Sequence, residues 1–198
     1  MTKEELIDLV KITLGDKHHE KVIEKALNAV WNTILYNTFK SNPDDLDLYA
    51  KEYNVLTAAL LTDAVTGLVY FVLPAAISQL PRAEQLREVR PLQDTTNTFD
   101  IINLSQRATL NNLQSDAITE KRTTCWVRGS RVEFEDLTAA HKSAGIMAVL
   151  VVAFDVYADT DVIYVPSGQD AQLLQLVSSY IANMPPETNI DNNTNKQT

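Results

Sequence analysis

The sequence predicts an α+β fold in which helices come first, an antiparallel β-sheet follows, and a last helix closes the chain. An apolar pair that recurs every four residues over positions 22–35 indicates a long amphipathic helix. Gly129-Ser130, between two strand-like runs, indicates a two-residue hairpin turn. The unbroken apolar run 146–154 has the length of a buried central strand. We therefore expect an N-terminal helical hairpin, a third helix, the sheet and a C-terminal helix.

The first two helices are the clearest part of this prediction. Thr2 and Glu5 have the spacing of a capping box, Gly15 is placed to end the first helix, and Asp16 can cap the second, which reaches about Phe39. The short link predicts that the two helices pack against each other. The expected apolar faces consist of Leu6, Leu9, Val10 and Leu14, and of Val22, Ile23, Ala26, Leu27, Val30, Trp31, Ile34 and Leu35.

A third helix is predicted from residue 43 onward. Asn42 can cap it, Pro43 suits its first position, and Asp44, Asp45 and Asp47 favour the positive end of the helix dipole. An apolar stripe at helical spacing then follows: Leu46, Tyr49, Tyr53, Leu56 and Leu60.

Strand signals dominate from residue 68 onward. Leu68–Leu73 is short, β-branched and aromatic, and it stops at Pro74. The prolines at 74, 81 and 91 predict an edge or surface course for the segment between them. Residues 99–113 are ambiguous and allow a helix. Residues 123–128 and 131–135 are expected to be the two strands of the hairpin.

The last third of the chain should contain a turn at Asp159–Asp161, a short strand at Val162–Val165 and the closing helix. Ser167 can cap that helix, with Asp170 in its first turn. Its packing residues are Leu173, Leu174, Val177 and Ile181.

The organisation that follows is one α+β domain over residues 1–186, with a helical part at 1–64 and the sheet plus C-terminal helix at 65–186. Residues 187–198 are rich in Asn and Thr, and we expect them to form a flexible polar tail.

Composition narrows the class of protein. The chain has 198 residues, 45% of them hydrophobic, and a net charge of −9. An acidic chain is a poor candidate for coating nucleic acid, because such proteins neutralise phosphates with Lys and Arg. The lone Cys125 excludes an internal disulfide and is expected in the core. The charged N-terminus predicts no signal peptide, and Asp63, Gly67 and Pro74 argue against a membrane span over residues 56–77.

Two groups of residues were considered as metal sites. His18, His19 and Glu20 are adjacent, so on a helix they diverge by about 100° per residue instead of converging, and a solvated first turn is preferred. The third histidine, His141, is distant in sequence. Asp155, Asp159 and Asp161 could gather oxygens for Ca²⁺, but they lack the glycine and the terminal glutamate of a known calcium loop, so a solvated turn is preferred.

No pattern specific to catalysis was recognised, and we predict no catalytic, cofactor-binding or metal-binding residues. Ser167-Gly168 before a helix is only a weak phosphate-loop signal, because it has one glycine and no lysine. Much of the positive charge lies in the middle of the chain and allows a basic face toward DNA or an acidic partner, with ordinary solvated strands as the preferred alternative. These residues are Arg82, Arg87, Arg90, Arg107, Lys121, Arg122, Arg128 and Arg131.

The order of the segments resembles that of the ring proteins (head–tail connectors, or adaptors) of short-tailed bacteriophages, especially the crAss-like group. The segments that carry the resemblance are the helical pair Glu4–Phe39, Leu73-Pro74, Leu80-Pro81, the charged strand Arg87–Pro91, Phe99, the hairpin Trp126–Phe134, and Val149–Asp161 leading through Val165-Pro166 to an acidic-capped helix.

The resemblance implies a non-enzymatic virion protein, made in the bacterial host cytoplasm, with no cofactor and no membrane contact. Such proteins form rings, commonly of twelve copies, that link the portal and other ring or tail proteins while genome DNA passes through the lumen without specific binding. A small α+β hydrolase-like enzyme with an unrecognised site, another phage neck or tail assembly protein, and a regulatory binding module of a bacterial host remain as alternatives.

Overall fold

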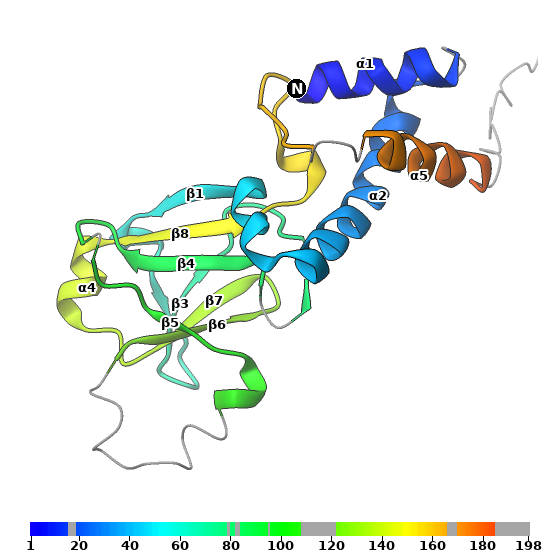
Figure 1. Ribbon diagram of the computed structural model, residues 1–198. Helices are drawn as coiled ribbons and strands as arrows, with labels where there is room; N and C mark the ends of the chain where they lie inside the picture. Colours follow the sequence, from blue (N-terminus) through cyan, green and yellow to red (C-terminus); the bar gives the residue numbers. More distant parts are fainter. Residues whose placement is uncertain are drawn as a thin grey trace, which may run out of the picture.

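The computed structural model describes residues 1–15, 19–78, 80–81, 84–94, 96–107, 122–165 and 170–184. It confirms the α+β class, with helices at both ends of the chain and β-strands between them. Figure 1 shows α1, α2 and α5 gathered on one side of the molecule, and the strands with the short helix α4 on the other. The predicted tail, residues 187–198, lies outside the described residues, as do Ser167 and Pro186.

The helical part consists of α1 (Lys3–Leu14), α2 (Glu20–Ser41) and α5 (Asp170–Ala182). The predicted capping box of α1 is present: the Glu5 amide donates to Thr2 Oγ1, and the Thr2 amide donates to the Glu5 carboxylate. Gly15 ends α1 with a φ of 75°, a conformation that glycine adopts without a steric cost. The N-cap of α2 is His19 and not Asp16, because the helix begins only at Glu20.

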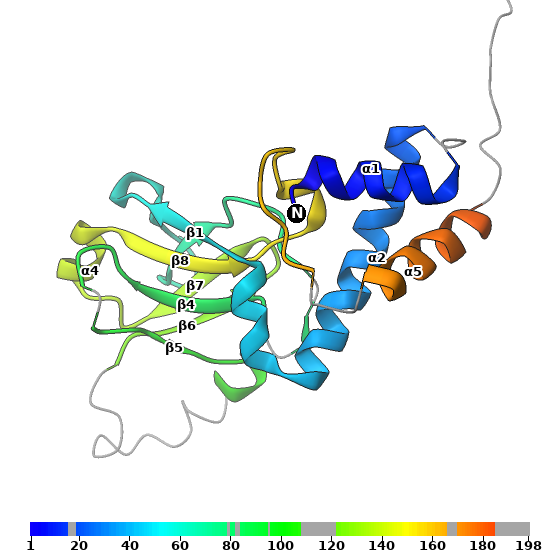
Figure 2. The ribbon, with the colours of Figure 1, turned by 45° about the horizontal axis from the view of Figure 1, so that its top comes forward.

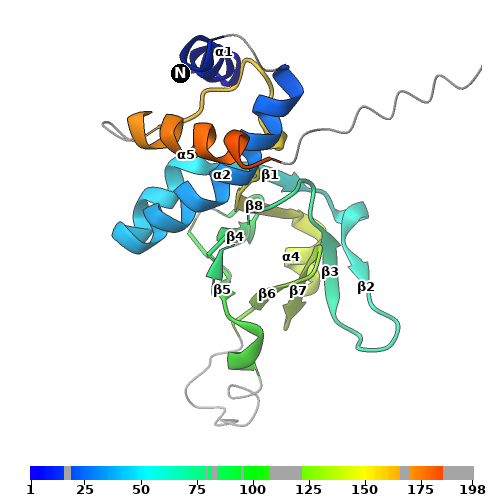
Figure 3. The same ribbon diagram turned by 90° about the vertical axis from the view of Figure 1, so that its right-hand side faces the viewer.

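The predicted apolar face of α2 is confirmed. Seven of its eight residues are buried, and Val22 is partly buried against the same core. α5 covers α2 with Leu173, Val177 and Ile181, which lie one helical turn apart and are all buried. Figure 3 shows α1 and α5 on the side of α2 that faces away from the strands.

The predicted third helix is wrong beyond Tyr49. A 3₁₀ helix, η1 (Pro43–Tyr49), gives way to strand β1 (Ala50–Val55), a second 3₁₀ turn, η2 (Thr57–Ala59), and a short strand β2 (Leu61–Thr62). The helical expectation for residues 1–64 therefore fails from residue 50 onward. The physical reason is a partner about a hundred residues away: β1 pairs in register with β8 (Ile146–Val151), from Ala50 opposite Val151 to Val55 opposite Ile146.

The strands form two sheets instead of one. β8 is the central strand of an antiparallel sheet with β1 on one side and β4 (Leu86–Pro91) on the other, which confirms the prediction of a buried central strand. The second sheet has the order β2-β3-β7-β6-β5 and is mixed, because β5 pairs with β6 in parallel. Its remaining strands are β3 (Val69–Val72), β5 (Asp100–Ile101), β6 (Thr124–Arg128) and β7 (Arg131–Glu135).

Several smaller expectations have clear outcomes. The hairpin of β6 and β7 turns at Gly129-Ser130 as predicted, with Gly129 at a φ of 62°. The short strand predicted at Val162–Val165 is absent, and only Val162 makes an isolated bridge, to Thr2. The ambiguous segment 99–113 contributes β5 and then a helical turn over residues 104–107, beyond which it lies outside the described residues. The helix α4 (Ala139–Ala144), capped by Thr138, was not predicted.

One continuous core joins the helices to the sheets. Trp31 of α2 lies at the junction, where its indole donates to the Val152 carbonyl at 3.3 Å and its ring meets Tyr49, Phe154 and Tyr157 edge-on. Figure 2 shows α2 running from the helical side down beside the strands. No helix in the described ranges is both long enough and apolar enough to cross a membrane.

Candidate functional site

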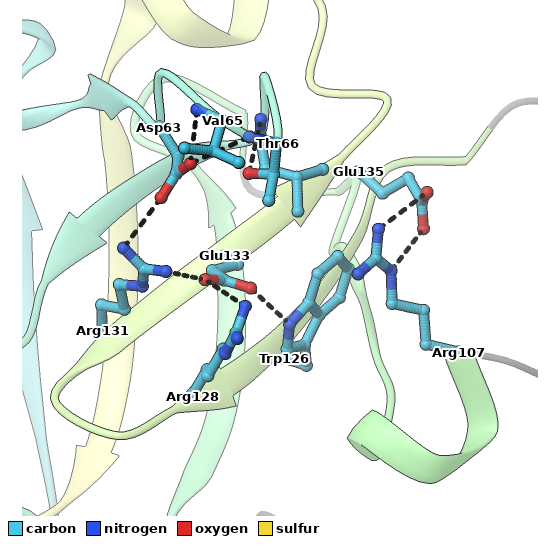
Figure 4. A network of polar contacts seen from close by, with 10 residues as sticks. Asp63, Val65, Thr66, Arg107, Trp126, Arg128, Arg131, Glu133 and Glu135 are labelled. Carbon is cyan, nitrogen blue, oxygen red and sulfur yellow. Dashed lines mark hydrogen bonds and ion pairs between the residues drawn. The ribbon is translucent and has the colours of Figure 1, made fainter.

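The most elaborate cluster of polar side chains lies on the outer face of the second sheet, around Glu133 of β7 (Figure 4). Successive residues of a strand point to opposite faces of a sheet. In β7 this places Val132 and Phe134 in the core cluster and turns Arg131, Glu133 and Glu135 to the other side. The two-residue turn fixes the hairpin register, so that Trp126 of β6 lies directly opposite Glu133.

Glu133 is a buried carboxylate with three donors. Its side chain is 2% exposed, and it accepts a hydrogen bond from the Trp126 indole nitrogen at 2.9 Å. Arg131 pairs with it at 2.7 Å, and Arg128 approaches at 3.6 Å. A buried charge of this kind is tolerated only when it is paired and hydrogen-bonded. The three contacts come from both strands of the hairpin, so they hold β6 and β7 in one register.

The cluster extends on both sides through aromatic rings and further carboxylates. Arg131 also pairs with Asp63 at 3.3 Å, and its guanidinium lies 4.8 Å from the centre of the Tyr70 ring. On the other side, Arg107 lies 4.5 Å from the centre of the Trp126 ring and pairs with Glu135 at 3.4 Å. Cation–π contacts of this kind stabilise a partly exposed face without leaving a free charge on it.

Asp63 anchors the turn between β2 and β3 to this cluster. Its carboxylate accepts hydrogen bonds from the backbone amides of Thr66 and Val65, at 2.9 and 3.0 Å. These two amide contacts, with the Arg131 guanidinium nearby, hold the pKa of Asp63 below its usual range. Asp63 is therefore fixed as an anion that ties the turn to the hairpin.

The chemistry open to this cluster is structural. Three arginines (Arg107, Arg128 and Arg131) face three carboxylates (Asp63, Glu133 and Glu135), so the charges cancel. The arginines are held against carboxylates, which leaves little free positive charge for phosphates. No group of three or more His, Cys, Asp and Glu side chains in the described ranges is arranged to hold a metal ion.

In the first group weighed as a metal site, the two residues that the structure describes make separate contacts. His19 serves as the N-cap of α2, where its Nδ1 accepts from the Lys21 amide at 3.4 Å, while Glu20 pairs with Lys11 of α1 at 3.1 Å. His141 lies on α4 beside the Phe99 ring, on the sheet side of the molecule. His18 lies outside the described residues.

The three aspartates considered for Ca²⁺ have different local roles. Asp161 pairs with Lys51 of β1 and accepts from the Ala158 amide at 2.7 Å, and these contacts hold its pKa below the usual range. Asp159 approaches the Lys3 amine at 3.6 Å, and Asp155 is exposed. Two of the three carboxylates therefore pair with lysines, and these pairs tie the turn to β1 and to α1.

Among the residues that the structure describes, most arginines of the middle of the chain are paired with carboxylates instead of forming an open basic face. Arg87 pairs with Asp47 at 2.6 Å and with Glu84 at 2.8 Å, and Arg90 pairs with Glu88 at 3.0 Å. Arg107, Arg128 and Arg131 belong to the Glu133 cluster, and Arg122 is exposed. Arg82 and Lys121, like Ser167-Gly168, lie outside the described residues.

Cys125 is buried in the core, as predicted, and burial raises the pKa of its thiol. The Glu133 cluster itself was missed from sequence. The signal was present: Arg131, Glu133 and Glu135 alternate with core residues, and the hairpin turn fixes Trp126 opposite Glu133. Arg107 and Asp63 reach the Glu133 cluster from distant segments, and no local sequence pattern predicts their contacts with it.

The chain was compared with protein-family models and with curated proteins. No protein-family model matches the chain, and no curated protein matches it significantly.

Proposed function

We propose that this chain is a non-enzymatic structural protein of the virion of a short-tailed, crAss-like bacteriophage. It forms a ring in the neck or tail, in about twelve copies as the resemblance of its segment order implies, and it links the portal to other ring or tail proteins around the DNA channel. It is made in the cytoplasm of the bacterial host and needs no cofactor and no membrane.

The observation that carries the proposal is the presence of large exposed apolar side chains in two separate parts of the molecule. The helical part exposes Ile12 of α1, which is 77% accessible, together with Tyr36 and Tyr180. The sheet part exposes Val65, which is 94% accessible, within the short segment 56–72. The remaining exposed apolar residues of that segment are Leu56, Leu61 and Val72.

Two surfaces on one subunit are what a stacked ring requires. A closed ring needs a heterologous contact, in which one surface of a copy meets a different surface of the next. A ring in a neck also needs a contact with the ring above or below it. Figure 3 shows β2 and β3 on the side of the molecule away from α1 and α5, so that contacts at one leave the other free.

The charge arrangement supports a channel that DNA passes without binding. Carboxylates neutralise five arginines of the middle of the chain: Arg87, Arg90, Arg107, Arg128 and Arg131. An overall charge of −9 adds repulsion between the protein and phosphates.

The test is the assembly state of the purified chain, with and without the portal protein of the same genome. We expect native mass spectrometry to show a closed oligomer and negative-stain images to show rings that co-sediment with the portal. A chain that stays monomeric under both conditions, and that is missing from purified particles, contradicts the proposal.

A further inference from the structure

Two solvent-facing helix surfaces of this molecule carry opposite charge. The first, the acidic α1 face, consists of Glu4, Glu5, Asp8 and Ile12, all of them exposed. With 3.6 residues per turn these positions share one side of the helix, opposite the buried Leu6 and Val10. The face is acidic at the start of α1 and apolar near its end.

The acidic α1 face continues into the turn beside it. The Glu4 amide donates to the Asp159 carbonyl at 3.1 Å, which places the exposed residue Asp159 close to the start of α1. Lys3 lies beneath it, with a side chain that is 9% exposed, and pairs with both Asp159 and Glu24. One cation adjoins this face: the Lys11 amine, on a side chain that is 25% exposed, pairs with Asp8 at 3.4 Å and with Glu20 at 3.1 Å. Carboxylates still outnumber exposed cations on the acidic α1 face.

The second surface, the basic α2 face, consists of Lys21, Lys25, Ala29, Tyr36 and Lys40. All five are exposed, and their spacing places them on one side of the helix. Lys40 lies 4.6 Å from the centre of the Tyr36 ring, so this face also has an aromatic part. The lysines span about 28 Å at 1.5 Å per residue.

The charges of α2 are sorted between its two sides. Glu20 and Glu24 pair with Lys11 and Lys3 of α1, at 3.1 and 3.3 Å. Within the described ranges, no carboxylate pairs with Lys21, Lys25 or Lys40. The carboxylates of the helix are thus used inside the molecule, and its lysines are left for a partner outside it.

We propose that the acidic α1 face of one copy binds the basic α2 face of the next copy, and that this contact closes the ring; the inference rests on the proposed function. The two faces lie on different helices that cross each other (Figures 1 and 3), as a heterologous contact requires. Like faces repel, so contacts of two acidic α1 faces or of two basic α2 faces are disfavoured. Ile12 would lose its exposed apolar surface against Ala29 and Tyr36.

A second copy of this chain would account for more of these exposed surfaces than a nucleic acid would. DNA would use only the lysines of the basic α2 face, and it would leave the acidic α1 face and the exposed Ile12 without a role. A neighbouring copy uses both faces and the apolar residue at once.

The test is a charge exchange. The α1 reversal is Glu4→Lys with Asp8→Lys, and the α2 reversal is Lys21→Glu with Lys25→Glu; Glu5 is left in place because it belongs to the capping box. Each reversal alone should raise the concentration at which half of the chain is assembled by about tenfold, an effect that weakens at high salt. A 1:1 mixture of the two variants, or both reversals in one chain, should restore assembly, because complementary faces then meet again.

Glu52→Lys and Arg122→Glu are the matched controls, because both side chains are exposed and neither face includes them. Circular dichroism and thermal unfolding check that every variant is folded. Mass photometry or analytical ultracentrifugation gives the assembly curve.

The outcomes separate the two proposals. Rings that form equally well in both reversals overturn the helix-face contact and leave the ring function standing. Rings that are lost in each reversal and stay lost in the mixture also overturn the contact. A wild-type chain that never self-associates, alone or with the portal, overturns both. Loss of duplex-DNA binding in the α2 reversal, with assembly unchanged, assigns the basic α2 face to nucleic acid and overturns the contact.

Discussion

Glu133 is the residue whose contacts bear most directly on the stability of the sheet. It is an almost fully buried carboxylate whose partners are two arginines and the Trp126 indole. Removing one member of a buried charge set leaves the other charges without compensation. The stability of the hairpin of β6 and β7 should therefore depend on this one side chain.

We predict that Glu133→Gln lowers the free energy of unfolding by about 2 kcal/mol, because the exposure of Arg128 moderates the full cost of an unpaired buried charge. Urea denaturation followed by Trp fluorescence measures the change. The matched control is Glu135→Gln on the same strand face, whose side chain is 28% exposed and should cost less than about 1 kcal/mol. Equal effects of the two substitutions would contradict the special role of Glu133.

Asp161 should make stability depend on acid pH. Hydrogen bonds from Lys51 and from the Ala158 amide lower the pKa of Asp161 in the folded state. Its contribution to the free energy of unfolding is therefore present above the unfolded pKa of about 3.9, and it is lost as the pH falls through the folded pKa. We predict that Asp161→Asn lowers the melting temperature at pH 7, and that the difference from the wild type shrinks as the pH falls below about 3.9. Thermal unfolding across this range is the measurement, with Asp155→Asn, which is exposed, as the control.

At the scale of elements, the approach of α4 to the end of β1 depends on Gly145. Its φ is +80° and its ψ is 171°, a combination that is nearly restricted to glycine. A Cβ atom there would lie 3.0 Å from the Val55 carbonyl oxygen. Both the backbone conformation and the space at this position therefore exclude a side chain.

We predict that Gly145→Ala costs at least about 2 kcal/mol of unfolding free energy. Gly67→Ala, at a φ of +71° but with no atom within 4 Å of its Cβ position, should cost only about 1 kcal/mol. The difference between the two, from chemical denaturation, isolates the close contact with Val55. If Gly145→Ala lowers the free energy of unfolding no more than Gly67→Ala does, the end of β1 can move to accommodate the added Cβ atom.

The elements also show which parts of the fold could be predicted from sequence. α1, α2, α5 and the hairpin of β6 and β7 were predicted because each is specified by neighbouring residues: a cap, a period or a turn. β1 was mistaken for a helix because Tyr49, Tyr53 and Leu56 have helical spacing. Its hydrogen-bond partner, β8, lies about a hundred residues away, and no local pattern reports that distance.

The same distinction applies to the candidate site. The Glu133–Trp126 pair follows from strand alternation and a two-residue turn, both of which can be read from the sequence. Arg107 and Asp63 reach the cluster from segments that are separate from the hairpin, and only the tertiary fold brings them there. The scattered arginines that allowed a basic face are paired with carboxylates. Some partners are near in sequence, as Glu88 is for Arg90, and others come from distant segments, as Asp47 does for Arg87.

At the scale of the whole molecule, we predict that the C-terminal tail contributes to attachment and not to folding. Deletion of residues 187–198 should leave the thermal unfolding of the chain unchanged while weakening its co-sedimentation with the portal. A polar segment can order on a partner, where new contacts offset the loss of conformational entropy. The control is a chain whose last twelve residues are scrambled; equal binding by the truncated chain would contradict the prediction.

The attachment of the first residues to a late segment has a consequence for synthesis. Thr2 bridges to Val162, and the Lys3 amide donates to the Asp161 carbonyl, so α1 has no final place until residue 163 has left the ribosome. α2 likewise waits for α5 to cover it. Nascent chains that lack the segment 161–163 therefore cannot present a correctly placed α1.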